Sequence, residues 1–427
     1  MQDILELHDA VNYRYLKSNS YGTVFIAIEM RSLKPPEDSI IRISDLSLVM
    51  DCSSSMQGEK FKQAKKSALQ LFELLDDDYY YLSVISFDKS ARVALSSTKK
   101  SESKAAEQDV IRNLKLGKGT NIYEGLELAF KEISDEPGIY FSNNKVLKPR
   151  RIVLLTDGQA SVGKIKEADF IDLSKRIRQQ DITVSTIGIG DKYDQELLQA
   201  IAETGGGLPY HVKEINDLQN IFSEQADDLT RTIQINPTLT ITVMPGAQIH
   251  DIYMVTPTLR KLSVNKSSRS GSNNNNHYTT GFRDIIVGHL QTIALRVDLP
   301  EKTSGVYRLA RVELNDLVKN IEVEYTDDHL LYSKETDPYP RMILTCSEAT
   351  SLVNKSIQIG DRETIRKAEA LMSGLSQDKD FEGIRTKRPI LNMMASRIRA
   401  IIERISQGPL KESEKKEALH ATMVSFK

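Results

Sequence analysis

Apolar residues recur along this chain with two different periods, and the period changes more than once. In "GTVFIAIEMR", Val24, Ile26 and Ile28 alternate with other residues, which predicts a half-buried β-strand. From about residue 44, short apolar runs such as "DLSLVM" and "RRIVLLT" alternate with stretches of helical spacing such as "EKFKQAKKSALQLFELL". Strands that alternate with helices imply crossover connections, so this region is expected to be α/β with a doubly wound, mostly parallel sheet.

After residue 233 the period returns to two, in "LTITVMPG", "HLQTIALRVDLP" and "NIEVEY". Antiparallel strands with one wet face are typical of a β-sandwich. The early strand around Ile26 has the same character, and a single strand is not stable alone. We therefore expect it to join the late strands, so that the α/β unit is inserted into the sandwich. The polar stretch "NKSSRSGSNNNNH" between the late strands is expected to be a mobile loop.

From about residue 338 the chain reads as helical. Five apolar residues recur there at intervals of three and four and predict a seam that packs on neighbouring helices: Leu391, Met394, Ile398, Ile401 and Ile405. The expected organisation is N-terminal sandwich strands in 1–43, the α/β domain in 44–232, the remaining sandwich in 233–335 and a helical region in 336–427.

Charge and composition restrict the partners and the compartment. The chain has 427 residues and a formal net charge of -2, so no global field favours nucleic acid or an acidic membrane. Its start lacks the basic and apolar regions of a signal peptide, and no run reaches the ~18 apolar residues that span a bilayer. Cys52 and Cys346 are too few for a disulfide framework. A cytoplasmic protein without a membrane span is expected, and no pattern sets its oligomeric state.

Polar residues gather where the predicted strands end. Asp51, Ser53 and Ser55 follow "DLSLVM", Thr120 lies in "GKGTN" before a predicted helix, and Asp157 follows "RRIVLLT". Loops at the carboxyl ends of strands form the ligand crevice of open α/β sheets, so these five residues are expected to converge. Small oxygen ligands without histidine or cysteine favour a hard cation such as Mg²⁺, or Mn²⁺.

With these residues in place, the chain resembles a von Willebrand factor type A (VWA) domain, a Rossmann-like fold, with a metal-ion-dependent adhesion site. The family pattern Asp-x-Ser-x-Ser matches Asp51, Ser53 and Ser55, its separate threonine matches Thr120, and its later aspartate matches Asp157. The resemblance covers roughly residues 44–232. The flanking sandwich and helical tail are similar, less specifically, to bacterial and archaeal multi-domain VWA proteins. Two positions depart from the family: Ser54, often glycine, and Cys52, often hydrophobic or threonine-like.

The resemblance implies how these residues act. The hydroxyls of Ser53, Ser55 and Thr120 would contact the metal directly, and Asp51 and Asp157 would act largely through bound waters. A cation with mostly neutral direct ligands stays electrophilic, and Mg²⁺ usually retains waters that a carboxylate can displace. The expected function is a metal-dependent protein-interaction module that binds an acidic side chain of a partner, without enzymatic activity.

Two other functions stay open at this point. One is an adaptor or regulatory subunit of an ATPase or another complex, with the helical tail as a docking surface. The other is a Mg²⁺-dependent phosphohydrolase that uses Asp51, although such enzymes usually need a second carboxylate beside the nucleophile and a lysine at the phosphate. Serines stand at the neighbouring positions instead.

Simpler interpretations exist for each polar motif. Any of the five site residues could cap the following helix. "GKGT" lacks the full spacing of a phosphate loop. "DDD" at 76–78 could be a second acidic site but suits a solvated turn, and Asp88 could approach the site loops or end a strand in a turn.

The remaining reactive or charged groups have similar alternatives. Cys52 could be a nucleophile, but no histidine lies near it in sequence, and an inert thiol is expected. The seven histidines are scattered without zinc-site spacing. The basic stretch "IRTKRP", with Arg397, Arg399 and Arg404, could contact an acidic partner or form a solvated helix face.

The last helix of the α/β domain, roughly Ile215 to Thr232, runs with little spacer into "QINPTLTITV". Pro237 fixes its own backbone angle and disfavours helix at Asn236, which predicts a stiff junction. In adhesion-type VWA domains, changes at the metal are linked to displacement of this helix. The resemblance therefore suggests, as a hypothesis, that partner binding and the helix position are coupled.

Overall fold

The structure is a computed structural model that describes residues 5–32, 41–75, 79–134, 146–213, 217–262, 264–268, 276–315 and 317–423. The chain forms two compact units. The sandwich unit consists of Met1–Lys34, Pro237–Phe282 and Gly288–Lys427, and the α/β unit consists of Pro35–Asn236 and Arg283–Val287. Each unit is described by itself.

The α/β unit is built on a six-stranded sheet in the order β11-β10-β9-β5-β6-β7. All neighbouring strands are parallel except β6 and β7, which are antiparallel. Every residue of β5 and β10 is buried, as expected for central strands covered on both faces. The strands are β5 (Ser44–Asp51), β6 (Tyr80–Phe87), β7 (Ala91–Lys99), β9 (Arg150–Thr156), β10 (Ile182–Ile189) and β11 (Gly206–Val212).

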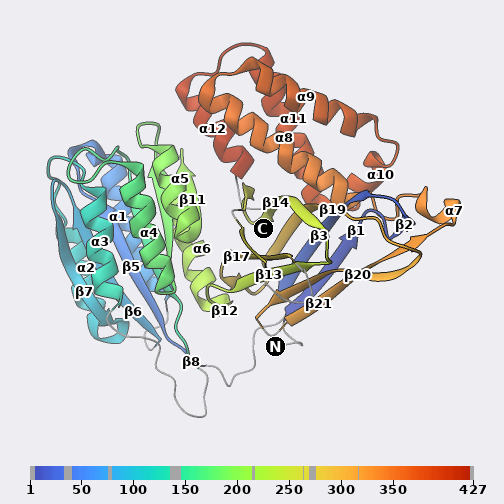
Figure 1. Ribbon diagram of the computed structural model, residues 1–427. Helices are drawn as coiled ribbons and strands as arrows, with labels where there is room; N and C mark the ends of the chain where they lie inside the picture. The colour runs from blue at the N-terminus through green and yellow to red at the C-terminus, as the bar shows by residue number, and fades with distance from the viewer. Residues whose placement is uncertain are drawn as a thin grey trace. The chain divides into compact units, whose positions relative to one another are not determined.

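Helices cover both faces of this sheet (Figure 1). One face packs on α1 (Glu59–Leu74), α2 (Lys100–Asn113) and α6 (Asp217–Arg231). The other packs on α3 (Ile122–Ser134), α4 (Glu167–Gln179) and α5 (Gln195–Thr204). Each helix turns an apolar stripe to the sheet, such as Phe170, Leu173 and Ile177 of α4. The expected doubly wound, mostly parallel fold is confirmed.

The sandwich unit has two sheets of largely antiparallel strands. One has the order β1-β3-β19-β14-β15 and the other β16-β17-β13-β20-β21-β2. The early strand β3 pairs antiparallel with the late strand β19, from Gly22 opposite Leu299 to Arg31 opposite Leu290. This pairing confirms that the α/β unit is inserted into the sandwich. The strands of the first sheet are β1 (Leu5–Val11), β3 (Gly22–Ser32), β14 (Gln248–Thr256), β15 (Arg260–Lys261) and β19 (Leu290–Leu299). Those of the second are β2 (Tyr15–Lys17), β13 (Thr238–Val243), β16 (Asn265–Ser268), β17 (Asn276–Gly281), β20 (Gly305–Leu314) and β21 (Leu317–Thr326).

The stretch expected to be a mobile loop is partly strand. Its first four residues form β16, and its last two belong to β17, which pairs with β16 from Asn265 opposite Thr279 to Ser268 opposite Asn276. The mobile-loop prediction is therefore wrong for these residues, because strands pair through the backbone and this pairing does not require apolar side chains. Residues 269–275 and the acidic 76–78 lie outside the described residues.

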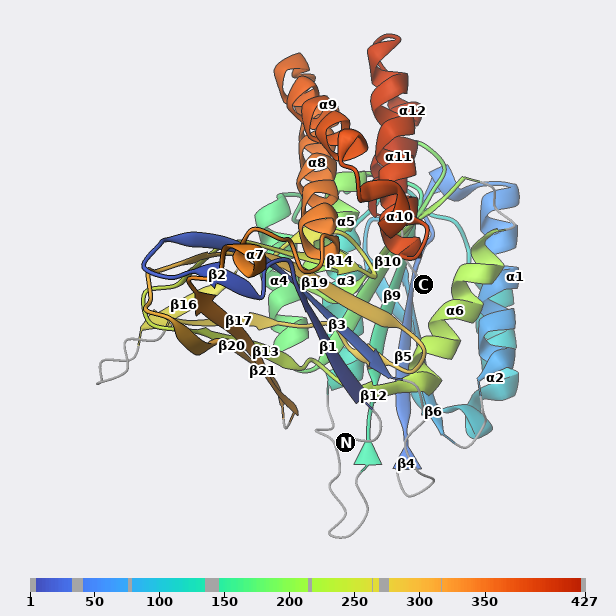
Figure 2. The same ribbon diagram turned by 90° about the vertical axis from the view of Figure 1, so that its right-hand side faces the viewer.

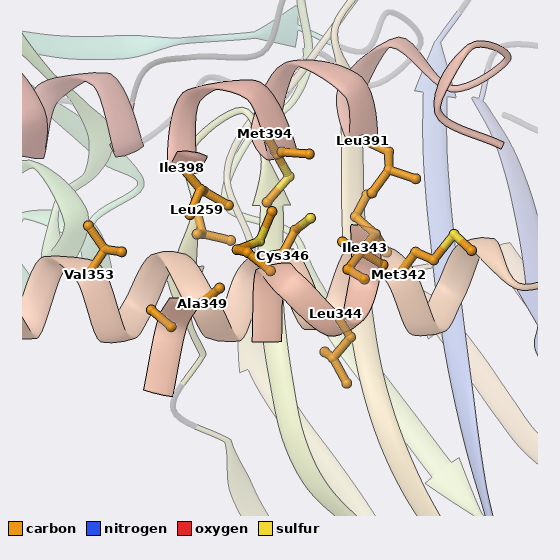
Figure 3. Packing of buried hydrophobic residues seen from close by; sticks show 14 of the residues in the cluster. Leu259, Met342, Ile343, Leu344, Cys346, Ala349, Val353, Leu391, Met394 and Ile398 are labelled. Atoms are coloured by element: carbon orange, nitrogen blue, oxygen red, sulfur yellow. The ribbon is translucent and has the colours of Figure 1, made fainter. Parts of the chain in front are cut away.

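The helical region belongs to the sandwich unit. It comprises α7 (His329–Tyr332), α8 (Tyr339–Ile359), α9 (Arg362–Gln377), α10 (Phe381–Arg385), α11 (Pro389–Ser406) and α12 (Glu412–Met423). Helices α8 and α11 lie side by side in both views (Figure 2). Figure 3 shows Leu391, Met394 and Ile398 of α11 pointing toward α8, where Ile343 and Cys346 are buried. The cluster also includes Ala27 and Ala294 of the sheet, so the predicted seam packs within the folded unit.

The chain returns to the α/β unit at residues 283–287, between two strands of the sandwich unit. There β18 (Ile285–Ile286) pairs antiparallel with β12 (Thr232–Gln234), which directly follows α6. Only β12 and residues 235–237 lie between α6 and β13, so the spacer is short as expected, and the stiffness of the junction stays a prediction. A further small pair joins β4 (Ile41–Arg42) to β8 (Val146–Leu147). No helix in the described ranges has the length and apolar character needed to cross a bilayer.

Candidate metal site

Three loops meet at the carboxyl edge of the parallel sheet. The first follows β5 and continues into the short 3₁₀ turn η1 (Ser54–Met56), the second precedes α3, and the third follows β9. Strands β5 and β9 are parallel neighbours, so Asp51 and Asp157, at or just beyond their ends, are brought to the same edge. Asp51 is the last residue of β5, and the other four predicted residues lie in these loops.

Side-chain hydrogen bonds join the first and third loops. The Oγ atoms of Ser53 and Ser55 share a hydrogen bond of 2.8 Å, and Ser55 Oγ donates to Asp157 Oδ1 at 2.6 Å. Thr156 Oγ1 donates to Asp51 Oδ2 at 2.5 Å, and the Ser53 N–H donates to Asp51 Oδ1 at 2.7 Å. Four of the five predicted residues therefore form one connected polar cluster, with Thr156 as an additional member.

The second loop is attached through backbone contacts. The Gly117 N–H donates to the Cys52 carbonyl at 2.7 Å. A side chain at Gly117 could not be accommodated, since a Cβ there would lie 1.9 Å from Asp88 Oδ2. Thr120 exchanges bonds with Ser161 of the third loop, accepting from its N–H and donating its own N–H to its Oγ, both at 3.0 Å.

The Thr120 hydroxyl lies close to the serine cluster. A Cβ built at Gly158 would be 3.6 Å from both Thr120 Oγ1 and Ser55 Oγ, so the two hydroxyls lie close to the same point beside Gly158. The structure thus brings all five sequence-predicted residues to one edge of the sheet.

The two carboxylates are buried and differ in their partners. Asp51 is fully buried, and burial raises the pKa of its carboxyl, opposed by the hydrogen bonds from Thr156 and Ser53. Asp157 has a side chain only 1% exposed, and its Oδ2 accepts a hydrogen bond of 2.5 Å from Lys60 Nζ. The lysine side chain is 34% exposed. The cluster therefore already attracts one positive charge, from a side chain that reaches solvent.

The capping interpretation is wrong for the two serines. Ser53 is the N-cap of η1 but makes no capping bond with its side chain, and α1 has Gly58 as N-cap. The serine hydroxyls bond to each other and to Asp157 instead. A cap does occur at the second loop, where the Glu124 N–H donates to Asn121 Oδ1 at 3.3 Å.

Asp88 combines the two roles considered for it. Its Oδ1 accepts the Ser90 N–H at 3.1 Å, which confirms a turn at the end of β6. Its carbonyl also accepts the Asn121 N–H at 2.7 Å, so the same turn supports the second site loop. Arg92 lies 3.4 Å from its carboxylate. Asp88 therefore positions the loop that carries Thr120.

The thiol of Cys52 is chemically quiet. It is 3% exposed, and burial, with the nearby Asp51 charge, raises its pKa to about 12. A thiol with that pKa is protonated at neutral pH, which disfavours a role as nucleophile. Within the described ranges, no three His, Cys, Asp or Glu side chains group as a metal site, so any metal here depends on the hydroxyls.

Three contributing residues were not predicted from the sequence. Thr156 and Ser161 flank Asp157 in the chain, and Lys60 lies five residues after Ser55. Their roles come from loop geometry: Ser161 bonds the second loop, Thr156 holds Asp51, and Lys60 reaches back from the first turn of α1. A lysine just beyond an acidic loop was a possible signal, but a solvated helix position fits it equally well.

Together these features define a doubly wound α/β domain with a hydroxyl and carboxylate cluster at the carboxyl edge of its sheet. Residues 45–224 match the von Willebrand factor type A domain, and this part of the chain belongs to that family. VWA domains are modules known for protein–protein interaction and metal-dependent binding.

Relatives are found in bacteria and animals. An uncharacterized protein of Synechocystis sp. is 29% identical over 223 residues, which are 52% of this chain and 50% of that protein. The uncharacterized protein YfbK of Escherichia coli is 27% identical over 205 residues, 45% of this chain and 34% of that protein. Inter-alpha-trypsin inhibitor heavy chain H2 of Mus musculus is 26% identical over 247 residues, 55% of this chain and 24% of that protein. The chain spans half or less of the length of these relatives.

Two solved structures share the fold over nearly the whole chain. A von Willebrand factor type A protein from Catenulispora acidiphila aligns with a TM-score of 0.75 and 16% identity, covering 99% of this chain and 98% of that one. The ArnB paralog VWA2 from Sulfolobus acidocaldarius aligns with a TM-score of 0.63 and 14% identity, covering 98% of both. The fold of this chain is therefore shared with other VWA proteins.

Proposed function

We propose that the VWA domain binds a divalent cation, Mg²⁺ or Mn²⁺, at the cluster of Asp51, Ser53, Ser55, Thr120 and Asp157. The observation that carries this proposal is the convergence of three hydroxyls and two buried carboxylates from three loops. Such burial of acids is costly unless positive charge or hydrogen bonds compensate it. Oxygen donors alone are the set that hard cations prefer.

The contact of Lys60 with Asp157 supports the same assignment. A cationic group already lies 2.5 Å from a carboxylate that is almost inaccessible to solvent. The ammonium acts as a stand-in for the positive charge that we assign to this position. In the proposed metal-bound form, Ser53, Ser55 and Thr120 supply direct oxygen ligands, while Asp51 and Asp157 hold bound waters and neutralise the ion.

The proposed role is binding of a partner protein. When bound, the cation would supply an electrophilic position suited to a carboxylate of the partner. Protein groups position this site: Thr156 fixes Asp51, and Ser161 and Asp88 fix the Thr120 loop. We propose no catalysis, because both Asp51 oxygens are already engaged and the Cys52 thiol is protonated.

The test is metal titration of the full chain, with Ser55→Ala compared with Ser54→Ala. Both serines lie in the same exposed turn, but only Ser55 bonds to the cluster. We expect Mn²⁺ affinity, followed by calorimetry, to fall about tenfold in the first variant and to stay unchanged in the second. Adding a glutamate-containing peptide should tighten Mn²⁺ binding to the wild type. Equal affinities for all three proteins would refute the assigned ligand set.

A further inference from the structure

A polar cavity lies within the sandwich unit. It has a volume of about 300 Å³ and lies between β1, β3 and β19 on one side and the starts of α8 and α11 on the other. Its lining includes Glu29, Arg31, Leu290, Tyr339, Lys387 and Arg388. Lys387 and Arg388 belong to the basic stretch "IRTKRP" that the metal-site proposal leaves unused.

Strand register explains the floor of this cavity. Arg31 of β3 stands between Glu6 of β1 and Leu290 of β19, and Glu29 stands opposite His8. Side chains two apart on a strand share one face of the sheet, so the four charged or ionisable groups point to the same side. The floor is therefore a grid of alternating charge with an apolar edge at Leu290.

The acidic groups of the cavity already have partners. Glu29 Oε1 accepts a hydrogen bond of 2.9 Å from the Tyr339 hydroxyl, and its Oε2 lies 3.5 Å from Arg388. Glu6 lies 3.1 Å from the His8 ring nitrogen. These pairs neutralise or satisfy the carboxylates that would otherwise repel an anion.

Two basic side chains of the lining, Arg31 and Lys387, are not used in these pairs. Among the described residues, neither Arg31 nor Lys387 makes a side-chain ion pair, and both are exposed. Arg388, the N-cap of α11, and Pro389 and Ile390 at its start also line the cavity, and the positive end of the helix dipole adds to the field there. The electrostatic field in the cavity therefore favours a negatively charged group.

Apolar surface lies next to these charges. The ring of Tyr339 is covered by the Arg388 guanidinium, 4.3 Å from its centroid, and Leu290, Pro389 and Ile390 complete the wall. Its volume of about 300 Å³ is at the lower end of the range of small-molecule sites, in which a few polar groups fix the orientation of the ligand.

We propose that this cavity binds a carboxylate attached to an apolar group, with Arg31 and Lys387 as its charge partners. A free organic acid and the end of a peptide chain present the same chemistry. The proposal is independent of the metal site, because none of the residues that line the cavity belongs to the VWA domain.

Calorimetry with the full chain tests this assignment. The small-molecule probe is N-acetylphenylalanine, with its neutral amide as the control. The peptide probe is a pentapeptide of glycine and serine that ends in phenylalanine, with either a free or an amidated C-terminus. We expect at least one free acid to bind and its amide to bind about tenfold more weakly or not at all. Preference for the peptide or for the small acid identifies the source of the carboxylate.

Variants locate the binding. The double variant Arg31→Gln/Lys387→Gln should weaken binding of the free acid about tenfold or more. The matched double variant Lys355→Gln/Arg366→Gln removes two exposed basic residues of α8 and α9 that do not line the cavity, and it should bind as the wild type does. Failure of both free acids to bind, equal binding of acid and amide, or unchanged affinity in the Arg31/Lys387 variant would overturn the proposal.

Discussion

Strand β9 has a buried charged residue near each end. The partners of these two residues differ in how far they are exposed to solvent. Near the start of β9, Arg151 lies 3.5 Å from Asp228 of α6, with both side chains only 5% exposed. Just beyond its end, Asp157 is bonded by a serine hydroxyl and by a lysine that reaches solvent. One end holds an ion pair that is buried on both sides, and the other holds a buried carboxylate whose charged partner reaches solvent.

A second fixed pair strengthens this contrast. At the amino edge of the sheet, opposite the candidate site, Arg178 donates a hydrogen bond of 3.0 Å to Asp284. The Asn236 N–H and the Thr183 hydroxyl also donate to the Asp284 carboxylate. Burial alone would raise the pKa of Asp284, but these partners hold it below its usual value. Asp284 lies in the segment 283–287, so this pair ties the returning chain into the VWA unit. Asp228 and Asp284 are thus each paired with an arginine whose side chain is at most 11% exposed, whereas the charged partner of Asp157 is a lysine that reaches solvent.

The largest expected effect follows from breaking the fixed pair. Asp228→Asn should lower the free energy of unfolding by about 3–5 kcal/mol, because Arg151 would keep a buried charge without its counter-ion. Chemical denaturation measures this. The neighbouring Asp227→Asn is the matched control, since its pair with Arg231 is 3.8 Å long and exposed. It should cost less than about 1 kcal/mol.

This variant also bears on the coupling hypothesis. The Asp228–Arg151 pair holds α6 to β9, and Arg151 NH1 also donates to Gln225 of α6 at 3.2 Å. If α6 shifts when a metal binds, these contacts must break or Arg151 must move with the helix. Such coupling stays a prediction. If Asp228→Asn destabilised the protein no more than Asp227→Asn, the far edge would not be the fixed end that the comparison requires.

The next effect concerns a carboxylate at the far edge that lacks an arginine partner within bonding distance. Asp45, at the start of β5, is 4% exposed, and burial raises its pKa to about 7 despite the charges of Lys148 and Arg150. Its Oδ1 is buried and makes no hydrogen bond to the described residues. Because of this raised pKa, the Asp45 carboxyl holds its proton more tightly in the folded protein than in the unfolded chain.

The sign of the pH dependence follows. The contribution of Asp45 to stability is fully present below its unfolded pKa near 4 and is lost as the pH rises through about 7. Asp45→Asn should therefore raise the free energy of unfolding at pH 8 by at most ~4 kcal/mol, with no gain at pH 4. Denaturation at both values measures this. A gain that is the same at the two pH values would assign the effect to packing rather than to charge.

The sequence predicted the centre of the VWA sheet better than its borders. The buried strands β5 and β10 are rich in aliphatic residues, which is enough to predict a strand although serine and threonine interrupt them. The two edge strands, β7 and β11, and the helix α2 were not predicted. Most residues of β7 are only half-buried, and β11 begins with two glycines and contains Pro209, so neither shows a clear period. An edge strand is defined by its neighbour, and that information is not local.

The candidate site shows the same division. Asp51, Ser53, Ser55, Thr120 and Asp157 could be named because the family pattern fixes their order. The supporting contacts of Ser161, Asp88 and Lys60 depend on how loops distant in sequence meet. The segment 283–287 is the extreme case, since nothing in its composition distinguishes it from the flanking sandwich strands. Long-range register decides such contacts, and periodicity carries no information about it.

At the carboxyl edge of the sheet, loss of a carboxylate should change metal affinity more than the stability of the fold. We expect Asp157→Ala to weaken Mg²⁺ or Mn²⁺ binding by ~10–100-fold, because groups that orient ligands and bound water typically contribute that much. Calorimetry measures the affinity, and thermal unfolding without metal should change little. Asp228→Asn provides the reverse pattern, with lower stability and near-normal metal affinity if the fold persists. Unchanged affinity in Asp157→Ala would remove Asp157 from the site.

The smallest expected effect tests whether Lys60 competes with the metal. Its ammonium is bonded to Asp157 and is one-third exposed, so the attraction is screened by solvent and is worth about 1 kcal/mol or less. A cation bound at the cluster must displace this group or share the carboxylate with it. Lys60→Met keeps the length of the side chain and removes the charge, so metal affinity should rise by about two- to fivefold.

Lys62→Met is the control, because that lysine is 76% exposed and pairs only loosely with Glu59, at 3.8 Å. Calorimetric titration with Mn²⁺ at low salt compares the three proteins, since added salt screens the difference. A fall in affinity in Lys60→Met alone would mean that the lysine supports the metal-bound form, and the cation at this end of the sheet would then be a fixed partner, like the arginines at the other.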